Sequence, residues 1–270
     1  DLAQTLDCGQ CFRFAPTGDG GWFGAAGGHA AGLRFEGESL VLEGATAAEF
    51  EGFWRDYLDL DRDYAAVRAA FARDPRLAPC VAFAPGIRVL RQPAFEALIA
   101  FIVSQNNNVP RIKGILARLC ALFGEPLPGG ARAFPAPERL AACSKEELAP
   151  LRSGWRAGYI LDAARQVAAG TVDLQAVAVM PLADARRELT RIRGVGPKVA
   201  ECVLLYGMGR LECFPMDVWM KRAMARLFPE ETGKMPESAP AIFGPYAGIA
   251  QQYIFHYCRC HPEEIREKTA

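Results

Sequence analysis

The chain has 270 residues, 51% of them hydrophobic, and its 31 basic residues balance 31 acidic residues. This length can bury a large core in one or two domains, and the zero formal charge excludes a globally basic nucleic-acid-binding protein, so any nucleic-acid surface must be local. Nine cysteines without a secretory segment favour reduced thiols over a disulfide framework, and no apolar run reaches the roughly 18 residues of a membrane span.

The first part of the chain has the pattern of a small α+β domain. Turn residues between short apolar runs predict strands over residues 10–14, 32–36 and 40–43. Thr46 and Glu49 form a capping-box pattern before an apolar-periodic helix that extends through Tyr57, and a second helix is expected over residues 63–72. We place the N-terminal domain at residues 1–91.

From residue 92 onward the pattern is almost wholly helical. Pro93 suits the start of a helix whose apolar positions share one face, and a polar segment, residues 104–108, interrupts this pattern. The remaining strong helical segments are residues 109–123, 159–168 and 246–258. We therefore expect a mainly α protein, with a helical domain over residues 92–270 and a small antiparallel α+β domain before it.

Residues 189–220 carry the most informative pattern. They predict the end of one helix and a tight turn that contains Gly194 and Gly196. A second helix opened by Pro197 follows, and a third helix begins near Asp217. A helix-hairpin-helix of this kind directs backbone N–H groups toward a phosphate without reading base sequence. An ordinary turn between two helices, and a cation bound by the carbonyls of the turn, are alternative interpretations.

Lys198 is expected in the first turn of the second helix, beside the positive end of the helix dipole. This position disfavours an ammonium and favours loss of its proton. Alone, such a lysine is usually a solvated surface residue, and Asp217 also fits a helix N-cap. The full pattern of hairpin, lysine, apolar helix and Pro-Met-Asp resembles the helix-hairpin-helix DNA glycosylases. The lysine resembles that of the bifunctional members, which cleave the glycosidic bond and then nick the strand.

The resemblance implies a catalytic pair. The neutral amine of Lys198 would attack C1′ of the deoxyribose and expel the base, which leaves a Schiff base that promotes β-elimination. Asp217 would steer the lysine and stabilise the positive charge that develops on the sugar. A role of Asp217 as a helix N-cap is compatible with this chemistry.

Four further segments extend the resemblance to the 8-oxoguanine DNA glycosylase/lyase family. They are CGQCFR at residues 8–13, SQNNN at 104–108 followed by Arg111, GWRA at 154–157 and GPYAGIAQ at 244–251. With the hairpin, they cover almost the whole chain. The resemblance implies removal of 8-oxoguanine, preferably opposite cytosine, from bent duplex DNA with the damaged nucleotide extruded, as a step of base excision repair.

Recognition of the lesion depends on one atom of the base. Oxidation at C8 turns N7 of guanine from an acceptor into an N–H donor, so a backbone carbonyl would bind the lesion and repel the normal base. By resemblance, this carbonyl belongs to Gly9, and Gln251 binds the Watson–Crick edge. Phe255 and Cys202 would lie on the two faces of the base. Without the resemblance, Phe255 would be read as a core aromatic and Gln251 as a polar surface residue.

The resemblance also implies residues that act on the strand left behind, because extruding a base costs a few kcal/mol of stacking and pairing. Asn106 would fill the gap. Arg111 and Arg156 would read the orphaned cytosine, although alone they would be read as phosphate contacts. Trp155 stands where the family often has a tyrosine that wedges into the duplex.

The hairpin glycines, Gly194 and Gly196, are expected to contact the DNA backbone. Elsewhere the sequence departs from the family. Trp219 stands where relatives often carry a histidine that contacts phosphate, and its indole N–H is the substitute donor. Tyr206 replaces a methionine that is common near the pocket, and Arg193 replaces a proline before the hairpin glycines.

Two groups of residues suggest a zinc site, but neither has convincing ligand spacing. The groups are Cys8 with Cys11, and His256, Cys258, Cys260 and His261. Cys8 and Cys11 fall where the family carries small polar residues, and one residue separates Cys258 from Cys260. The four closely spaced terminal cysteines that hold an iron–sulfur cluster in some of these glycosylases are missing. We expect no metal, no iron–sulfur cluster and no organic cofactor, and leave open a structural cation at the hairpin turn.

Two rival functions stay open. A glycosylase for another damaged purine would share the fold, but Lys198 argues against it because monofunctional relatives work without an amine nucleophile. A non-catalytic helix-hairpin-helix DNA-binding module would use the hairpin for backbone contacts alone. We expect a monomeric enzyme that binds double-stranded DNA containing oxidised guanine and does not bind a membrane. The expected location is the bacterial cytoplasm, on nucleoid DNA, or the nucleus in a eukaryote.

Overall fold

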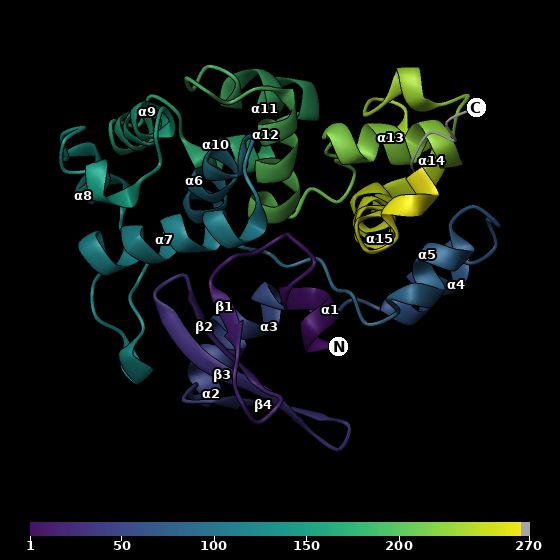
Figure 1. Cartoon of the computed structure of the whole chain (residues 1–270), viewed down its shortest axis with the longest axis horizontal. Helices are drawn as coiled ribbons and strands as arrows, with labels where there is room; N and C mark the ends of the chain where they lie inside the picture. The colour runs from purple at the N-terminus through teal and green to yellow at the C-terminus, as the bar shows by residue number, and fades with distance from the viewer. Residues whose placement is uncertain (266–270) are drawn as a thin grey trace.

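The computed structural model describes residues 1–265, in which a small antiparallel sheet is joined to a larger assembly of helices (Figure 1). The N-terminal residues build the sheet, and helices form nearly everything that follows. No helix within residues 1–265 is long and apolar enough to cross a membrane. The expected mainly α fold with a small N-terminal α+β part is confirmed.

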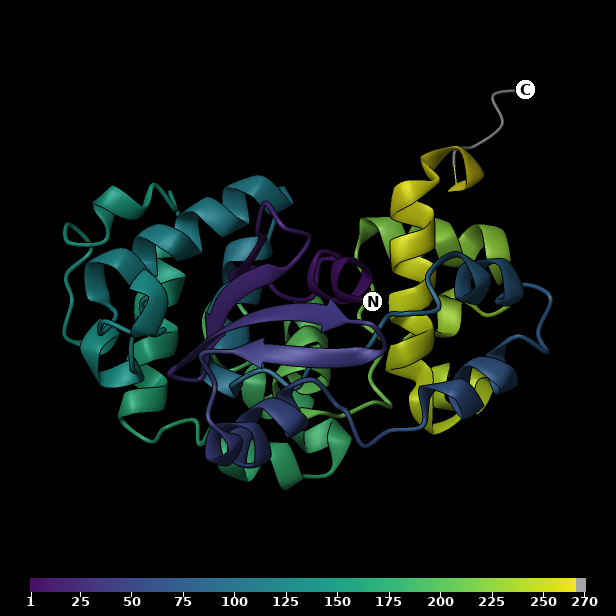
Figure 2. The same ribbon diagram turned by 90° about the horizontal axis from the view of Figure 1, so that it is seen from below.

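The sheet is a four-stranded antiparallel meander in the order β1-β2-β3-β4, and it lies nearest the viewer in Figure 2. Its strands are β1 (Phe14–Pro16), β2 (Trp22–Ala26), β3 (His29–Glu36) and β4 (Ser39–Glu43). Gly27 and Gly28 both have positive φ and form the two-residue turn between β2 and β3. Two-residue turns of this kind match the right-handed twist of the flanking strands. They require residues that tolerate positive φ, such as glycine.

The strand expected over residues 10–14 is wrong for most of its length, because β1 begins only at Phe14. The preceding residues form a loop that binds neighbouring segments. The Gln10 side chain donates to the carbonyls of Thr5 (2.8 Å) and Arg88 (2.7 Å). These contacts hold the loop in place and leave it outside the sheet.

The sequence pattern also misses β2 and a short helix, α1 (Leu2–Leu6). β2 contains small residues where strong β-formers would signal a strand. Gly24 lies opposite Phe14 in the register, and a Cβ atom at Gly24 would come within 2.4 Å of the phenylalanine ring. Packing between strands therefore requires the residue that makes this strand hard to predict.

Short helical elements after the sheet complete the N-terminal core. They are α2 (Ala47–Glu49), a π-helical turn η1 (Phe50–Trp54) and α3 (Arg55–Tyr57). Both hydrogen bonds of the expected capping box between Thr46 and Glu49 are present. Trp54 and Tyr57 are buried and pack against Phe14 of the sheet. This cluster is separate from the core of the helical part.

The next two helices, α4 (Tyr64–Phe71) and α5 (Ala78–Phe83), pack away from the sheet. Their buried side chains belong to the core of the helical part, and α5 contacts the last long helix, α15 (Ala247–Cys260). Figure 2 shows these helices beside α15. The domain boundary at residue 91 stays a prediction. Residues 64–83 precede this boundary in sequence, but their buried side chains pack in the core of the helical part.

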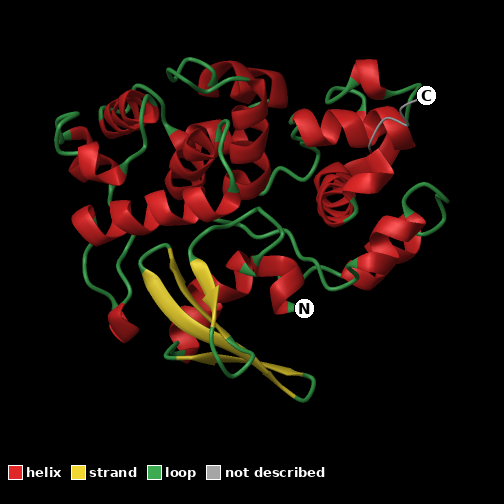
Figure 3. Ribbon diagram, in the orientation of Figure 1, coloured by secondary structure: helices red, strands yellow, loops and turns green. Residues whose placement is uncertain are grey.

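The helical part fills most of Figure 3. Its other helices are α6 (Ala94–Ser104), α7 (Val109–Phe123), α8 (Pro137–Ala141), α9 (Arg156–Ala168), α10 (Leu174–Val179), α11 (Leu182–Leu189), α12 (Pro197–Cys202), α13 (Val218–Leu227) and α14 (Ala239–Phe243). Short helical turns between and after them are η2 (Pro128–Gly130), η3 (Ala149–Leu151), η4 (Val203–Gly207), η5 (Thr232–Lys234), η6 (Gly244–Tyr246) and η7 (Pro262–Ile265).

Helix α6 is the central element of the helical part. All residues from Glu96 to Val103 are buried, and the helix contacts α7, α9, α12 and η4. It begins directly after Pro93 and ends at Ser104, as the sequence predicts. Its last turn therefore places Phe101 and Ser104 beside the start of α12, where the predicted catalytic residues lie.

Candidate active site

The hairpin consists of α11, a tight turn and α12, as the sequence predicts. Gly194 has a φ of +86°, and a Cβ atom there would lie 2.2 Å from the Tyr159 ring of α9. Gly196 has ordinary extended backbone, and a Cβ atom there would meet nothing within 4 Å. Packing within the protein therefore requires glycine at position 194. At position 196, the absence of a side chain leaves open space beside the backbone.

Lys198 and Asp217 line the same cavity. Pro197 occupies the first position of α12, so Lys198 follows in the first turn. Asp217 is the N-cap of α13, where its Oδ1 accepts the backbone N–H of Met220 (2.7 Å). The structure brings together six predicted site residues around this cavity, namely Gly9, Lys198, Cys202, Asp217, Gln251 and Phe255. We call it the base cavity below.

The amine of Lys198 is held by weak contacts. Its Nζ lies 3.4 Å from the hydroxyl oxygen of Ser104 and 5.1 Å from the centre of the Phe101 ring. Within residues 1–265, no carboxylate lies within ion-pair distance of this amine. A lysine engaged with a hydroxyl and an aromatic face can leave them at little cost, since such contacts are weaker than a buried ion pair. The arrangement keeps the amine available for a reaction.

Cys202 lies one turn after Lys198 and is buried in the wall of the cavity. Burial raises the pKa of its thiol to about 11. The thiolate is the nucleophilic form of cysteine, so Cys202 is an uncharged wall of the cavity at neutral pH. The amine and not the thiol is therefore the nucleophile that this site offers.

Gly9 approaches the cavity from the N-terminal loop. It has a φ of +92°, and a Cβ atom would lie 3.2 Å from Cε1 of Phe255. Within residues 1–265, its carbonyl accepts no hydrogen bond. Gly9 is only partly buried, so this carbonyl is an acceptor that a donor from outside the chain can reach.

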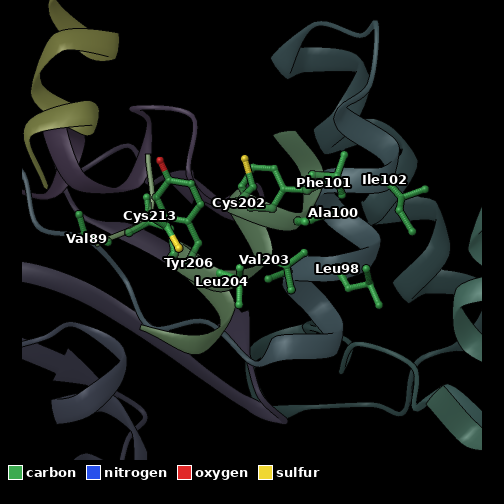
Figure 4. Close-up of a cluster of buried hydrophobic side chains, with 14 of the residues drawn as sticks. Val89, Leu98, Ala100, Phe101, Ile102, Cys202, Val203, Leu204, Tyr206 and Cys213 are labelled. Carbon is green, nitrogen blue, oxygen red and sulfur yellow. The ribbon is translucent and has the colours of Figure 1, made fainter. Parts of the chain in front are cut away.

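Gln251 is buried and contacts Tyr206 and Pro215, neither of which is among the predicted site residues. Its Nε2 donates to the carbonyl of Pro215 (3.2 Å), and its Oε1 lies 3.1 Å from the hydroxyl of Tyr206. The Tyr206 ring stacks on Phe101 with 5.3 Å between centroids. Figure 4 shows Phe101 on α6 facing Cys202 and Tyr206 on α12 and η4. Phe101, Tyr206 and Pro215 all line the base cavity.

A buried carboxylate supports the segment that carries Asp217. Glu201, on α12, accepts the Arg186 side chain (2.5 Å) through one oxygen and the backbone N–H of Phe214 (2.7 Å) through the other. This links both helices of the hairpin to the chain just before Pro215. Since Pro215 and Asp217 both line the cavity, Glu201 fixes their distance from Lys198 on the same helix.

The base cavity is small. Its volume of about 40 Å³ is close to that of one water molecule, whereas sites for small molecules usually exceed 300 Å³. Two wider depressions, of about 720 and 430 Å³, contain none of the predicted site residues. The chemistry of the lining and not its volume therefore singles out the cavity, and a ligand the size of a base would fit only if the walls moved apart.

A second group of predicted residues is linked to the segment that follows Ser104, whose hydroxyl contacts Lys198. We call Asn106, Arg111, Trp155 and Arg156 the arginine–tryptophan cluster. Arg156 is buried, and its guanidinium donates to the carbonyls of Gln105 (3.0 Å) and Asn106 (2.9 Å). Its guanidinium carbon lies 4.2 Å from the centre of the Trp155 ring. Arg156 is expected to bind the orphaned cytosine, but in this structure its N–H groups already donate to the backbone of residues 105–106.

The other members of the arginine–tryptophan cluster are exposed. Trp155 is 51% exposed, and Asn106 adopts a φ of +46° at the surface. Arg111 lies on the first turn of α7, and the pKa of Arg156 is lowered first by burial and then by the charge of Arg111. Trp219, at the start of α13, is 41% exposed and separate from this cluster. All of these side chains are accessible to a large ligand except that of Arg156.

The cysteine and histidine groups considered for zinc are not brought together in the part of the chain that the structure describes. Within residues 1–265, no three or more His, Cys, Asp or Glu side chains are placed to hold a metal ion. Cys8 is fully buried, and burial raises the pKa of its thiol to about 12. The cation considered at the hairpin turn stays a prediction.

Three comparisons relate this geometry to known proteins. Residues 1–98 match the family model of the 8-oxoguanine DNA glycosylase N-terminal domain. Residues 99–244 match that of the HhH-GPD superfamily base excision DNA repair proteins. The N-glycosylase/DNA lyase OGG1 of Arabidopsis thaliana is 31% identical over 277 residues, which cover 94% of this chain and 76% of the plant protein.

Solved structures agree with the family models. The structure of MBOgg1 in complex with a low affinity DNA ligand has a TM-score of 0.93 and 39% identity, over 97% of this chain and 93% of that one. The 8-oxoguanine glycosylase/lyase of Clostridium acetobutylicum, in complex with double-stranded DNA containing cytosine opposite 8-oxoguanine, has a TM-score of 0.92 and 34% identity, over 97% and 92%. The chain therefore belongs to the 8-oxoguanine DNA glycosylase family of the HhH-GPD superfamily.

Proposed function

We propose that this protein is a bifunctional DNA glycosylase that removes 8-oxoguanine from duplex DNA and then cleaves the strand at the abasic site, as a step of base excision repair. The similar proteins named above include an N-glycosylase/DNA lyase and an 8-oxoguanine glycosylase/lyase. The observation that carries the proposal is the base cavity, which joins the amine of Lys198, the carboxylate of Asp217 and the available carbonyl of Gly9.

The proposed reaction begins with Lys198. Its Nζ attacks C1′ of the deoxyribose while the bond from C1′ to N9 breaks, and the base leaves with the electron pair and takes up a proton. Opening of the sugar ring gives a Schiff base. Loss of a C2′ proton then expels the 3′ phosphate by β-elimination. Asp217 stabilises the positive charge on the sugar through the carboxylate oxygen that does not cap α13.

Recognition of the lesion is assigned to the other side of the cavity. The N7–H of 8-oxoguanine donates to the Gly9 carbonyl, whereas the N7 lone pair of guanine would face that same oxygen. Gln251 reads the Watson–Crick edge after exchanging the Pro215 carbonyl for the base. Phe255 and Cys202 enclose the ring from its two faces. Entry of the base requires the walls of the 40 Å³ cavity to separate, which is a conformational change coupled to DNA binding.

The arginine–tryptophan cluster is assigned to the strand left behind. Asn106 fills the gap and Trp155 wedges into the duplex, since both are exposed. Arg111 and Arg156 read the orphaned cytosine, which explains a preference for that base. Arg156 must first exchange the carbonyls of residues 105–106 for the base, so cytosine recognition depends on a rearrangement of this segment.

Contacts with the DNA backbone are assigned to the hairpin. The open space beside Gly196 lets a phosphate approach the N-terminus of α12, and Gly194 sets the shape of the turn. Trp219, in the first turn of α13 after Asp217, is 41% exposed, and its indole N–H is the proposed phosphate donor. A monomer suffices for these contacts, and the enzyme acts where the genome lies, in the bacterial cytoplasm or the eukaryotic nucleus.

Borohydride trapping tests the proposal. Reduction of the Schiff base should give a covalent complex between the protein and an 8-oxoguanine duplex, because the imine between Nζ and C1′ becomes a stable amine. Lys198→Gln should abolish the adduct and strand cleavage, a loss of more than about 1,000-fold. Lys145→Gln removes an exposed lysine far from the cavity and is the matched control.

The outcomes separate the rival functions. Base release without an adduct would favour a monofunctional glycosylase. Equal adducts with alkylated and oxidised duplexes would move the substrate to another damaged purine. DNA binding with neither base release nor an adduct would leave a DNA-binding module. An adduct that survives Lys198→Gln would overturn the assignment of the nucleophile.

A further inference from the structure

The loop around Gly9 is held by side chains from distant parts of the chain. The carbonyls on both sides of Gly9 each accept an N–H group from such a side chain. The pairs are Asp7 with Arg259 (2.6 Å), Cys8 with Gln252 (3.1 Å) and Gln10 with Gln92 (2.8 Å). In the described part of the chain, the Gly9 carbonyl alone among these four accepts no hydrogen bond. The loop is therefore fixed on either side of one available acceptor.

Gln252 connects this loop to the base cavity. It is fully buried on α15, next to Gln251. While its Nε2 donates to Cys8, its Oε1 accepts the hydroxyl of Tyr206 (2.6 Å). Tyr206 lines the base cavity and stacks on Phe101. A continuous chain of hydrogen bonds thus runs from the cavity wall through Gln252 to the peptide that precedes Gly9.

The amide of Gln252 can take only one orientation in this chain. The Cys8 carbonyl is an acceptor only and must face Nε2, so Oε1 must face Tyr206. Burial raises the pKa of Tyr206 well above its ordinary value, so the phenol keeps the proton that it donates. That hydroxyl has one hydrogen and lies closer to Gln252 (2.6 Å) than to Gln251 (3.1 Å). The proton belongs to the bond with Gln252, so the bond to the Pro215 carbonyl is what the Gln251 amide must give up to turn toward a ligand.

The bond to Cys8 has a direct effect on Gly9. It fixes the plane of the peptide between these two residues, and the φ (+92°) and ψ of Gly9 direct the next carbonyl relative to that plane. Glycine itself would allow many other values of φ, so the direction depends on the neighbouring contacts. We propose that Gln252, held by Tyr206, is a positioning residue that aims the Gly9 carbonyl and so sets the preference for 8-oxoguanine over guanine.

This proposal rests on the proposed function, because it assigns the alignment of the atom that contacts N7. A misdirected carbonyl would lose both its bond to the N7–H of the lesion and its repulsion of the guanine lone pair. DNA that lacks the base has neither interaction. Loss of Gln252 should therefore affect base discrimination far more than the reaction of Lys198 with an abasic site.

The main test measures binding in the Lys198→Gln background, where the duplex stays intact. Gln252→Leu keeps the approximate size of the side chain and removes both hydrogen bonds. The ratio of Kd for a guanine duplex to Kd for an 8-oxoguanine duplex should fall about tenfold. In the enzyme that keeps Lys198, Gln252→Leu should lower the rate of borohydride trapping on an abasic duplex by less than about twofold.

A second variant tests the chain with a smaller change. Tyr206→Phe removes one oxygen atom and should lower the same ratio about threefold, because Gln252 loses one of its two partners. Added to Gln252→Leu, it should have a smaller effect than alone, since both act on one network. Tyr64→Phe is the matched control, a buried tyrosine bonded to Asp59 (2.9 Å) away from the cavity, and should leave the ratio unchanged.

Each outcome supports or overturns the role of Gln252. A selective fall in base preference supports it. An unchanged preference in Gln252→Leu overturns it, and so does an equal loss of binding preference and abasic trapping, which would indicate general damage to the fold. If Gln252→Leu does not fold, an unchanged preference in Tyr206→Phe overturns it. A wild-type enzyme with neither lesion preference nor adduct would overturn the proposed function itself, which distinguishes the two failures.

Discussion

The base cavity and the arginine–tryptophan cluster differ in the state of their polar groups. In the described part of the chain, the Gly9 carbonyl accepts no hydrogen bond and Lys198 has no carboxylate partner. In the cluster, by contrast, the Arg156 guanidinium already donates to the carbonyls of Gln105 and Asn106. The cavity leaves this carbonyl and this amine without a strong partner, although at about 40 Å³ it is too small to hold a base. The cluster must break its own hydrogen bonds before it can make new ones.

This difference indicates how the two kinds of selectivity arise. A fixed backbone acceptor distinguishes two bases without reorganisation at the moment of contact, as preorganised sites do. A guanidinium that must change partners pays a free-energy cost that only a good ligand offsets. We therefore expect discrimination of the lesion to depend on rigid elements, and discrimination of the opposite base to depend on a movable segment.

After Lys198→Gln, the largest effect is expected from Asp217→Asn, which removes a charge from the base cavity. Asparagine caps a helix as well as aspartate does, so α13 should keep its start while the charge is lost. Base release under single-turnover conditions should slow by about 100-fold, or about 2.7 kcal/mol, with little change in duplex affinity. Asp173→Asn, at the N-cap of α10 away from the cavity, should show no such loss. A large fall in affinity instead would assign Asp217 to structure.

A smaller effect is expected from Arg111→Ala, which tests the role of the arginine–tryptophan cluster in selecting the opposite base. The rates of 8-oxoguanine release opposite cytosine and opposite adenine should differ about tenfold less than in the wild type, because one base contact is worth about 1–3 kcal/mol. Release from an unpaired lesion should hardly change. Arg73→Ala removes an exposed arginine at the end of α4 and is the control. Undiminished preference for cytosine would remove Arg111 from this role.

The smallest effect is a change of stability with pH, which we expect from His256. This residue lies on α15, the helix that carries Gln251 and Phe255 of the base cavity. The pKa of His256 is lowered from 6.5 to about 4, first by burial and then by Arg259, while Asp7 opposes the shift and His261 adds to it. Below pH 6.5 the unfolded chain takes up a proton that the folded chain refuses until about pH 4. Stability should therefore fall as the pH decreases through this window.

Thermal unfolding measures this effect. Between pH 7 and pH 5 the wild type should lose about 1 kcal/mol that His256→Phe keeps, because phenylalanine fills the site beside Phe83 without titrating. Identical pH profiles for the wild type and His256→Phe would show that another group is responsible.

Much of the candidate site could be predicted because its residues are unusual in their local positions. Pro197 starts a helix, Asp217 caps one, and Gly194 occupies a turn that no other residue fits, so each signal is local in sequence. The helices that the sequence predicts over residues 109–123 and 246–258 are confirmed with small shifts. These features depend on the chain within a few residues of each position.

The rest depends on contacts between distant segments. Phe101 lies in a helix that is apolar on every side, so nothing in the pattern separates it from core residues. Gln252 looks like a polar surface residue until Cys8 is placed beside it. Arg156 matches a family position, but its bonds to residues 105–106 follow only from the meeting of α6 and α9. Local sequence patterns carry no information on these contacts between distant segments.

The position of α4 and α5 has a practical consequence for dissecting this enzyme. Their buried residues Tyr64, Val67 and Phe71 fill the same core as α15, while the Gly9 loop is anchored on α15 from the other end of the sequence. A fragment beginning at residue 92 would expose that apolar surface to water and remove one wall of the active site. Such a truncated polypeptide should be insoluble when expressed alone, and mixing it with residues 1–91 would be required to regain solubility and catalysis.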